Sequence, residues 1–155
     1  MKRWLWCAGA LLFTAVLGGM PFAGTDIAKL QPVEVLRVQK DGDMISVELD
    51  TGDSGKGTTL EAALQDLKES TPGKVFLETA DYLLINGEAE VLLESLAEYL
   101  RPACGVCLEA GEAKLEEAAQ FLGVHEPGLT LQEYRAGDHA LQELVVREER
   151  MYLVS

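Results

Sequence analysis

The chain has 155 residues, of which 48% are hydrophobic, so it is long enough to form one domain with a proper core. It carries 26 acidic and 13 basic residues, a net charge of −13 at neutral pH. This negative field, with no basic stripe to offset it, repels nucleic-acid backbones and anionic lipid surfaces, so no nucleic-acid partner is expected. The three cysteines are too few for a disulfide framework.

Residues 1–23 have the pattern of a targeting segment. Lys2 and Arg3 form a positive start, an uncharged apolar run follows, and small residues lie around Ala23. The run could be cleaved as a signal peptide after Ala23, or it could stay as a membrane anchor, because residues 4–22 are just long enough to span a bilayer. We therefore predict an exported or membrane-anchored protein whose folded domain is residues 24–155.

The domain is expected to open with a β-hairpin. The apolar-rich runs Val33–Gln39 and Met44–Asp50 flank Asp41-Gly42, and Asp-Gly is a strong signal for a tight hairpin turn. The following stretch, Asp50–Gly57, is polar and rich in glycine, which predicts a loop.

The central part of the chain has the clearest pattern, helix then strand then helix. Thr58 and Glu61 have the spacing of a capping box, and Thr71-Pro72-Gly73 predicts the end of the first helix. Lys74–Ile85 is rich in branched and aromatic residues and predicts a strand. Apolar residues at helical spacing mark the two helices that must cover it: Leu60, Ala63, Leu64 and Leu67, then Leu92, Leu93, Leu96 and Leu100.

The last third predicts one more strand, one more helix and a terminal strand pair. Gly105–Ala110 is the candidate inner strand, and Lys114–Leu122 has one apolar face of a helix. Leu129–Tyr134 is ambiguous, while Leu144–Arg147 and Met151–Val154 look like strands around a charged turn. Together these elements predict an α/β fold, a small mixed sheet with about three helices mainly on one face.

Two short patterns resemble enzyme motifs, and both have a simpler interpretation. Gly55-Lys56-Gly57 resembles a phosphate-binding loop, but Gly52 and Gly55 are too close together and no Ser or Thr follows the lysine. Asp50-Thr51-Gly52 resembles the catalytic turn of aspartic proteases, whose two aspartates must share a proton and whose fold is nearly all strand. A glycine-containing connector and an aspartate that ends a strand are the preferred interpretations.

Cys104 and Cys107 form the remaining candidate site, a C-x-x-C pair. A redox pair of the thioredoxin type lies at a helix N-terminus, whereas Gly111 follows too soon here for a helix. Structural thiols are the preferred interpretation, with a disulfide or a catalytic redox pair as alternatives. Zinc would need two more ligands, and His125 and His139 have no matching spacing. No metal, no cofactor and no catalytic residue is therefore predicted.

Several segments carry a resemblance to a known family. The first pattern is an acidic I-x-x-L segment before the first strand. The second is a T-L-x-x-A-L-x-x-L helix that ends in a Thr-Pro turn with a basic residue. The third is a strand that ends in an apolar-Ile-x-Gly turn. These segments are Asp26–Leu30, Thr59–Leu67 with Thr71–Lys74, Leu83–Ala89, and the helix end Tyr99-Leu100-Arg101. Over about residues 25–125 the chain resembles the N-terminal domain of the Ger(x)C family, the C subunits of spore germinant receptors.

The resemblance implies a non-catalytic interaction domain in spore germination, held at a membrane, with germinant receptor subunits among its expected protein partners. Members of the family are lipoproteins with two further domains. Here Cys7 lies too near the start to accept a lipid, and the sequence ends at Ser155, so a stand-alone relative is expected. The alternative is an extracytoplasmic thiol protein that uses Cys104 and Cys107.

Overall fold

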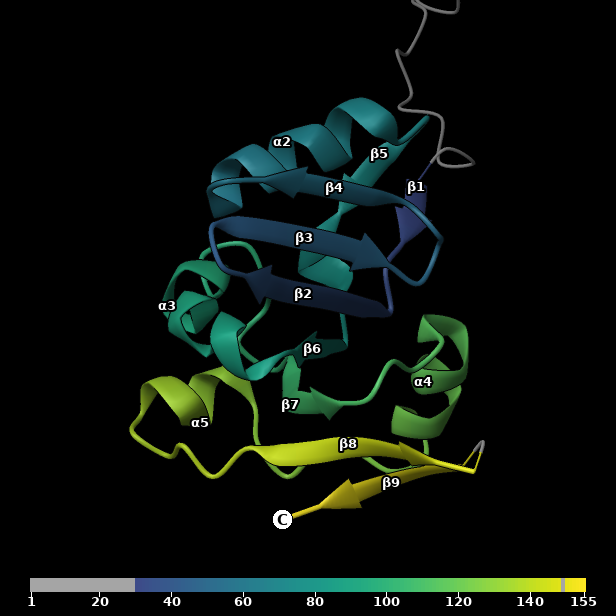
Figure 1. The fold of residues 1–155 in the computed structure, drawn as a ribbon, viewed down its shortest axis with the longest axis vertical. Coiled ribbons are helices and arrows are strands. Elements are labelled where there is room, and N and C mark those ends of the chain that lie inside the picture. Colours follow the sequence, from purple (N-terminus) through teal and green to yellow (C-terminus); the bar gives the residue numbers. More distant parts are fainter. Residues whose placement is uncertain (1–29, 149) are drawn as a thin grey trace, which may run out of the picture.

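The computed structural model describes residues 30–148 and 150–155, and the predicted signal peptide or anchor at residues 1–23 lies outside them. Seven strands form one mixed sheet in the order β4-β3-β2-β6-β7-β8-β9 (Figure 1). β2, β6, β7 and β8 run parallel, whereas β3, β4 and β9 are antiparallel to their neighbours. The strands are β2 (Val35–Asp41), β3 (Met44–Leu49), β4 (Ser54–Gly57), β6 (Tyr82–Ile85), β7 (Gly105–Ala110), β8 (Gln142–Arg147) and β9 (Arg150–Val154).

Helices cover both faces of this sheet. On the first face lie α2 (Leu60–Ser70), the 3-10 helix η3 (Gly87–Leu92) with α3 (Leu93–Leu96), and α5 (Leu131–Arg135). On the second face lies α4 (Leu115–Leu122). Figure 1 shows α4 on the opposite side of the molecule from α3 and α5. The predicted α/β class, with helices mainly on one face, is therefore confirmed.

Each face of the sheet has its own apolar core. The first face carries the larger cluster, in which the leucines of α2 and α3 pack on alternate residues of β2, β3, β6 and β7. The smaller cluster on the second face packs α4 against residues of β2, β6, β7 and β8, including Val35, Leu84 and Leu144. This division follows from the strand repeat of two, which sends successive side chains to opposite faces.

The central stretch differs from the predicted helix, strand and helix in two respects. The second helix, predicted to run to Leu100, is the 3-10 helix η3 followed by only four α-helical residues in α3. Lys74–Ile85 is not one strand, because it is divided into β5 (Lys74–Phe76), a 3-10 turn η2 (Leu77–Thr79) and β6. β5 pairs in parallel with β1 (Leu30–Pro32) in a separate two-stranded sheet, and only β6 enters the main sheet. The Thr79 hydroxyl helps to fix the turn, since it accepts a hydrogen bond from the Val33 N–H at 3.0 Å.

Two local predictions near α2 are also wrong. The helix is capped by Thr59, whose hydroxyl accepts the Ala62 N–H at 3.1 Å, so the cap is one residue later than the Thr58–Glu61 capping box. The predicted glycine-rich loop ends in strand β4, where Gly55 and Gly57 lie directly under α2. A Cβ atom on Gly55 would lie 2.3 Å from the backbone of Ala63, so the glycines permit close contact between strand and helix.

Gly55→Ala is expected to lower the free energy of unfolding by about 1–3 kcal/mol, because the added methyl group meets helix backbone that cannot rotate away. Gly87→Ala is the matched control: an added Cβ there has no atom within 4 Å, and a change within about 0.5 kcal/mol is expected. Chemical denaturation of the two variants measures both values. Equal losses would show that α2 does not pack on β4 as described.

Candidate functional site

The structure separates the two candidate cysteines. Cys104 is fully buried in the cluster on the first face, and Cys107, in β7, is fully buried in the cluster on the second face. Both are free thiols, and they lie on opposite sides of the sheet. Burial raises the pKa of Cys104 to about 12, and Arg101 opposes this only in part. Burial, with the charge of Glu109, likewise raises the pKa of Cys107 to about 12.

These thiols predict a loss of stability in alkaline solution. In the unfolded chain they ionise near pH 9, whereas in the folded protein they stay neutral up to about pH 12. Above pH 9 the unfolded state therefore binds fewer protons, and the free energy of unfolding falls as the pH rises. Between pH 8 and pH 10 we expect a fall of roughly 1 kcal/mol for each thiol. In the double variant Cys104→Ala, Cys107→Ala, the free energy of unfolding measured by denaturation should not show this fall between pH 8 and pH 10. A variant with the same pH dependence as the natural chain would contradict the burial of the two thiols.

Neither enzyme-like motif forms a site. Asp50 directly follows β3, and its carboxylate accepts the Glu34 backbone N–H at 3.2 Å, so it ties the end of the strand to the start of β2. Lys56 lies on β4, with its backbone N–H bonded to Asp66 on α2 rather than arranged around an anion. His125 and His139 are exposed, and each contacts one aromatic ring, of Phe121 and Tyr134. Within residues 30–148 and 150–155, no group of three metal-ligating side chains is found.

A buried ion-pair network lies on the second face, and sequence reasoning missed it. Arg37 of β2 is only 5% exposed and forms a two-pronged contact with Glu109 of β7, Nε to Oε2 at 2.9 Å and Nη2 to Oε1 at 2.7 Å. Its Nη1 also donates to Glu48 of β3 at 2.9 Å. Burial alone would lower the pKa of Arg37, but the hydrogen bonds and charges of Glu109 and Glu48 outweigh it and raise the pKa. The guanidinium is therefore permanently charged.

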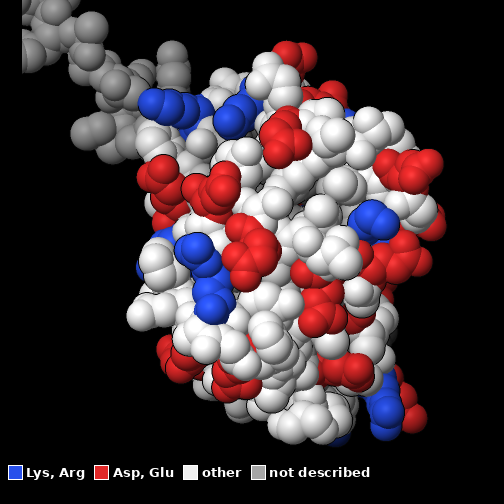
Figure 2. All heavy atoms as spheres, turned by 90° about the vertical axis from the view of Figure 1, so that its left-hand side faces the viewer, with Lys and Arg blue, Asp and Glu red and all other residues white. Residues whose placement is uncertain are grey.

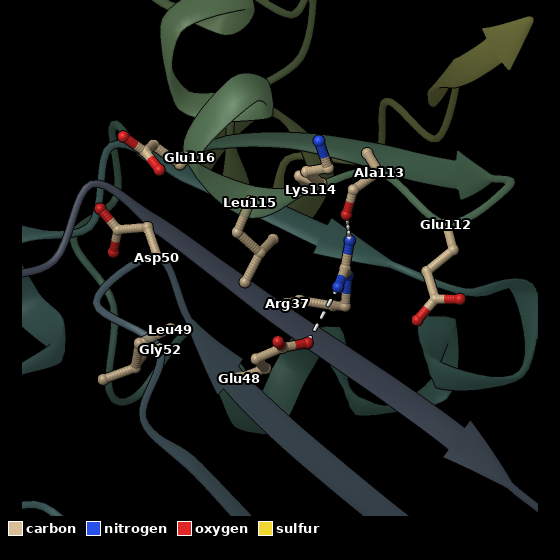
Figure 3. A pocket seen from close by; sticks show the side chains of 10 residues that line it. All are labelled: Arg37, Glu48, Leu49, Asp50, Gly52, Glu112, Ala113, Lys114, Leu115 and Glu116. Atoms are coloured by element: carbon tan, nitrogen blue, oxygen red, sulfur yellow. Dashed lines mark hydrogen bonds and ion pairs between the residues drawn. The ribbon is translucent and has the colours of Figure 1, made fainter. Parts of the chain in front are cut away.

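The same network holds the segment that leads into α4. Ala113 donates its N–H to Glu109 at 2.9 Å, and its carbonyl accepts from Arg37 Nη2. Figure 3 shows Arg37 pointing up from β2 toward this carbonyl, with Glu48 below it. The network thus joins β2, β3 and β7 to the start of α4, and we name it the Arg37 brace.

The brace lies under an open depression of about 490 Å³ (Figure 3). Four carboxylates line it, which would repel an anionic ligand: Glu48, Asp50, Glu112 and Glu116. The Arg37 guanidinium could bind a ligand only by giving up its bonds to Glu109 and Ala113. The geometry therefore favours a structural role for this depression.

A second surface, which we name the α3–α5 face, has the chemistry of a protein contact. Between α3 and α5 lies a hollow of about 460 Å³, lined by Ala97, Pro102, Leu131, Gln132, Arg135 and Ala136. Val91 of η3 is 75% exposed, and Glu88, Glu94 and Glu98 are exposed along the same η3–α3 segment. Figure 2, which views the molecule from the side of α3, shows acidic side chains spread over this surface with few basic ones among them.

The carboxylates of the α3–α5 face are only lightly neutralised. Arg135 of α5 lies 3.6 Å from Glu94, and both side chains are mostly exposed, so the contact is weak. The Tyr134 hydroxyl donates to Glu90 at 3.5 Å. An apolar hollow beside exposed carboxylates suits a partner that combines basic and apolar side chains.

No protein family model, no curated protein and no solved structure matches the chain. In the part of the chain that the structure describes, no helix is long and apolar enough to cross a bilayer.

Proposed function

We propose that the chain is a non-catalytic interaction module, exported and held at a membrane by its N-terminal apolar segment, and related to the N-terminal domain of the Ger(x)C germinant receptor subunits. The observation that carries the interaction role is the α3–α5 face, where an apolar hollow lies beside exposed carboxylates. The partner is a membrane-associated protein, for which the subunits of a germinant receptor are the first candidates.

The net negative charge of the domain supports a partner with a basic surface. Residues 24–155 contain 11 basic and 26 acidic residues, a net charge of −15. A surface with this potential attracts a basic partner, speeds its association and repels acidic competitors. Because the carboxylates of η3 and α3 are exposed, binding should weaken as salt concentration rises.

The positions of the polar side chains support a non-catalytic module over the alternative thiol protein. A redox cysteine needs an accessible thiol with a lowered pKa, whereas both Cys104 and Cys107 are buried and have raised pKa values. Arg37 and Glu109, the most buried charges of the second face, bind each other and the backbone of Ala113. These groups stabilise the fold, and the exposed surface is what remains for function.

Charge reversal on the α3–α5 face tests the proposal. The full chain is co-expressed with the membrane subunits of a germinant receptor from the same genome, and co-purification is measured for the natural chain and for Glu94→Lys, Glu98→Lys. We expect the natural chain to co-purify and the variant to lose about tenfold in affinity, since like charges then face each other.

The control is Glu116→Lys, Glu117→Lys, which makes the same change in net charge on α4, across the sheet. This variant should bind as the natural chain does. Absence of co-purification of the natural chain would refute the receptor partner, and equal losses in both variants would refute the α3–α5 face as the contact. The variant Cys104→Ala, Cys107→Ala should bind normally, whereas loss of binding there would favour the thiol alternative.

A further inference from the structure

The two edge strands of the main sheet differ in whether their outward backbone groups are hydrogen-bonded. At the β4 edge, side chains of α2 bind the outward backbone groups: Asp66 accepts the Lys56 N–H at 2.8 Å, and the Ser70 hydroxyl donates to the Ser54 carbonyl at 3.0 Å. At the β9 edge, no described residue makes a hydrogen bond to the outward backbone groups of the strand. An edge strand with open backbone groups is a template for another strand.

The hairpin register identifies which groups of β9 face outward. Arg147 and Arg150 are opposite each other across a two-residue turn, in which Glu148 has a positive φ of 49°. The residues that close such a turn are a hydrogen-bonded pair, and bonded and non-bonded pairs then alternate along the hairpin. Tyr152 is therefore bonded to β8, while the N–H and carbonyl groups of Met151 and Leu153 point away from the sheet.

The side chains of β9 offer apolar surface on both faces of the strand. Met151 and Leu153 are partly buried against the cluster on the second face. Tyr152 and Val154 point to the first face, where they stay 45% and 47% exposed. β9 lacks the usual protection of an edge strand, a proline or an inward charge.

We infer that β9 pairs antiparallel with β9 of a second copy of this chain, about a two-fold axis that passes between the two Tyr152 residues. In this register Met151 lies opposite Leu153 of the second copy, and the two tyrosines face each other. Apolar side chains then meet on both faces of the paired β9 strands, and aromatic pairs are among the cross-strand pairs that stabilise a sheet. The outward N–H and carbonyl groups of Met151 and Leu153 become paired.

Charge complementarity selects a second copy as the occupant. Arg147 and Arg150 lie directly opposite each other, and no described residue forms an ion pair with either. In the inferred register Arg150 lies opposite Val154 of the second copy. Glu143 of the second copy is the β8 residue paired with that valine, on its far side from Arg150. Two strand spacings separate Arg150 from that glutamate, about 10 Å, which the two long side chains can bridge over the shorter valine.

The same strand is the point of least repulsion between two acidic molecules. Residues 24–155 carry a net charge of −15, yet β9 contains one basic residue and no acidic one. Five residues make a small contact, well below the roughly 1,600 Å² of a standard interface, so the dimer is weak in free solution. Confinement of the chains to one membrane raises their effective concentration and favours pairing. The dimer is measured with this chain alone and needs no partner protein, although its measurement in vesicles rests on the proposed N-terminal anchor.

Disulfide trapping tests the register. The full chain with Cys7→Ser and Tyr152→Cys is reconstituted in lipid vesicles and exposed to a mild oxidant. In the inferred dimer the two residues at position 152, one from each copy, would form a non-hydrogen-bonded pair. The Cα atoms of such a pair lie about 4.5 Å apart, within disulfide reach. We expect covalent dimers from this variant and few from Cys7→Ser with Val91→Cys, a more exposed residue on η3. Equal trapping of both variants, or trapping of neither, would overturn the inference.

A charge swap at position 152 tests whether the strand that pairs with β9 is β9 of a second copy. Tyr152→Glu and Tyr152→Lys chains are each labelled for energy transfer between copies in vesicles, alone and mixed. Each variant alone should lose about fivefold in affinity, because it places like charges opposite each other, and the mixture should recover it. A mixture that stays as weak as the separate variants would show that β9 binds something other than β9, such as residues 1–29 or a different protein, and would overturn the inference.

Discussion

Arg37→Met is expected to lower the free energy of unfolding by about 3–5 kcal/mol. The reason is the position of its partner: the Glu109 side chain is only 2% exposed and would be left buried without a counter-ion. Ala113 would also lose the donor to its carbonyl. Methionine fills much of the arginine volume, so the loss reports on charge and hydrogen bonds more than on packing.

Two further variants separate these contributions. Glu48→Gln removes the charge of the other carboxylate, which is 45% exposed, and should cost about 1 kcal/mol or less. The double variant Arg37→Met, Glu109→Leu should recover much of the loss, because it leaves no unpaired buried charge. Chemical denaturation measures all three. If Arg37→Met costs no more than Glu48→Gln, the brace is not a significant source of stability.

Leu64→Ala is expected to cost about 2–5 kcal/mol. Leu64 lies on the buried side of α2, within the large cluster of the first face. Removal of its branched end leaves a cavity that the neighbouring leucines cannot fill, because their own positions are fixed by the helix and the sheet beneath.

Gln65→Ala is the control for this change, since Gln65 follows Leu64 on the exposed side of the same helix. Its side chain donates to Glu69 at 2.7 Å on the surface, and a change of at most about 0.5 kcal/mol is expected. A loss below about 0.5 kcal/mol for Leu64→Ala would show that this helix does not bury the predicted face.

Local patterns predicted much of the fold, because the elements involved are determined by short-range chemistry. The hairpin signal at Asp41-Gly42, the leucine spacing of residues 60–67 and the apolar run 105–110 each lead to the observed element, although the hairpin turn itself is Gly42-Asp43. Lys74–Ile85 was predicted as one strand because composition does not show that its halves pair with different partners. That division depends on β1, about 40 residues earlier in the chain.

The Arg37 brace shows why the candidate site was harder to predict. Arg37 and Glu109 are 72 positions apart, and neither belongs to a recognisable motif. A signal was present, since a charged residue interrupts an apolar run in Val35-Leu36-Arg37-Val38, and Glu109 occurs in another buried strand. Such residues need an opposite charge nearby. The sequence does not show which of the many carboxylates supplies it.

The strand order has a consequence for how the chain folds as it emerges from a ribosome or a translocation channel. β2, β3 and β4 form a meander, and β6, β7, β8 and β9 then join the opposite edge one after another in chain order (Figure 1). No strand of the main sheet has to insert between two strands that are already paired. The nascent chain can therefore fold vectorially, each new strand docking on the last one, which limits the time that any apolar intermediate edge stays open to aggregation. By this route β9 is the last strand to form, so the edge inferred to pair with a second copy becomes available only when the rest of the sheet is complete.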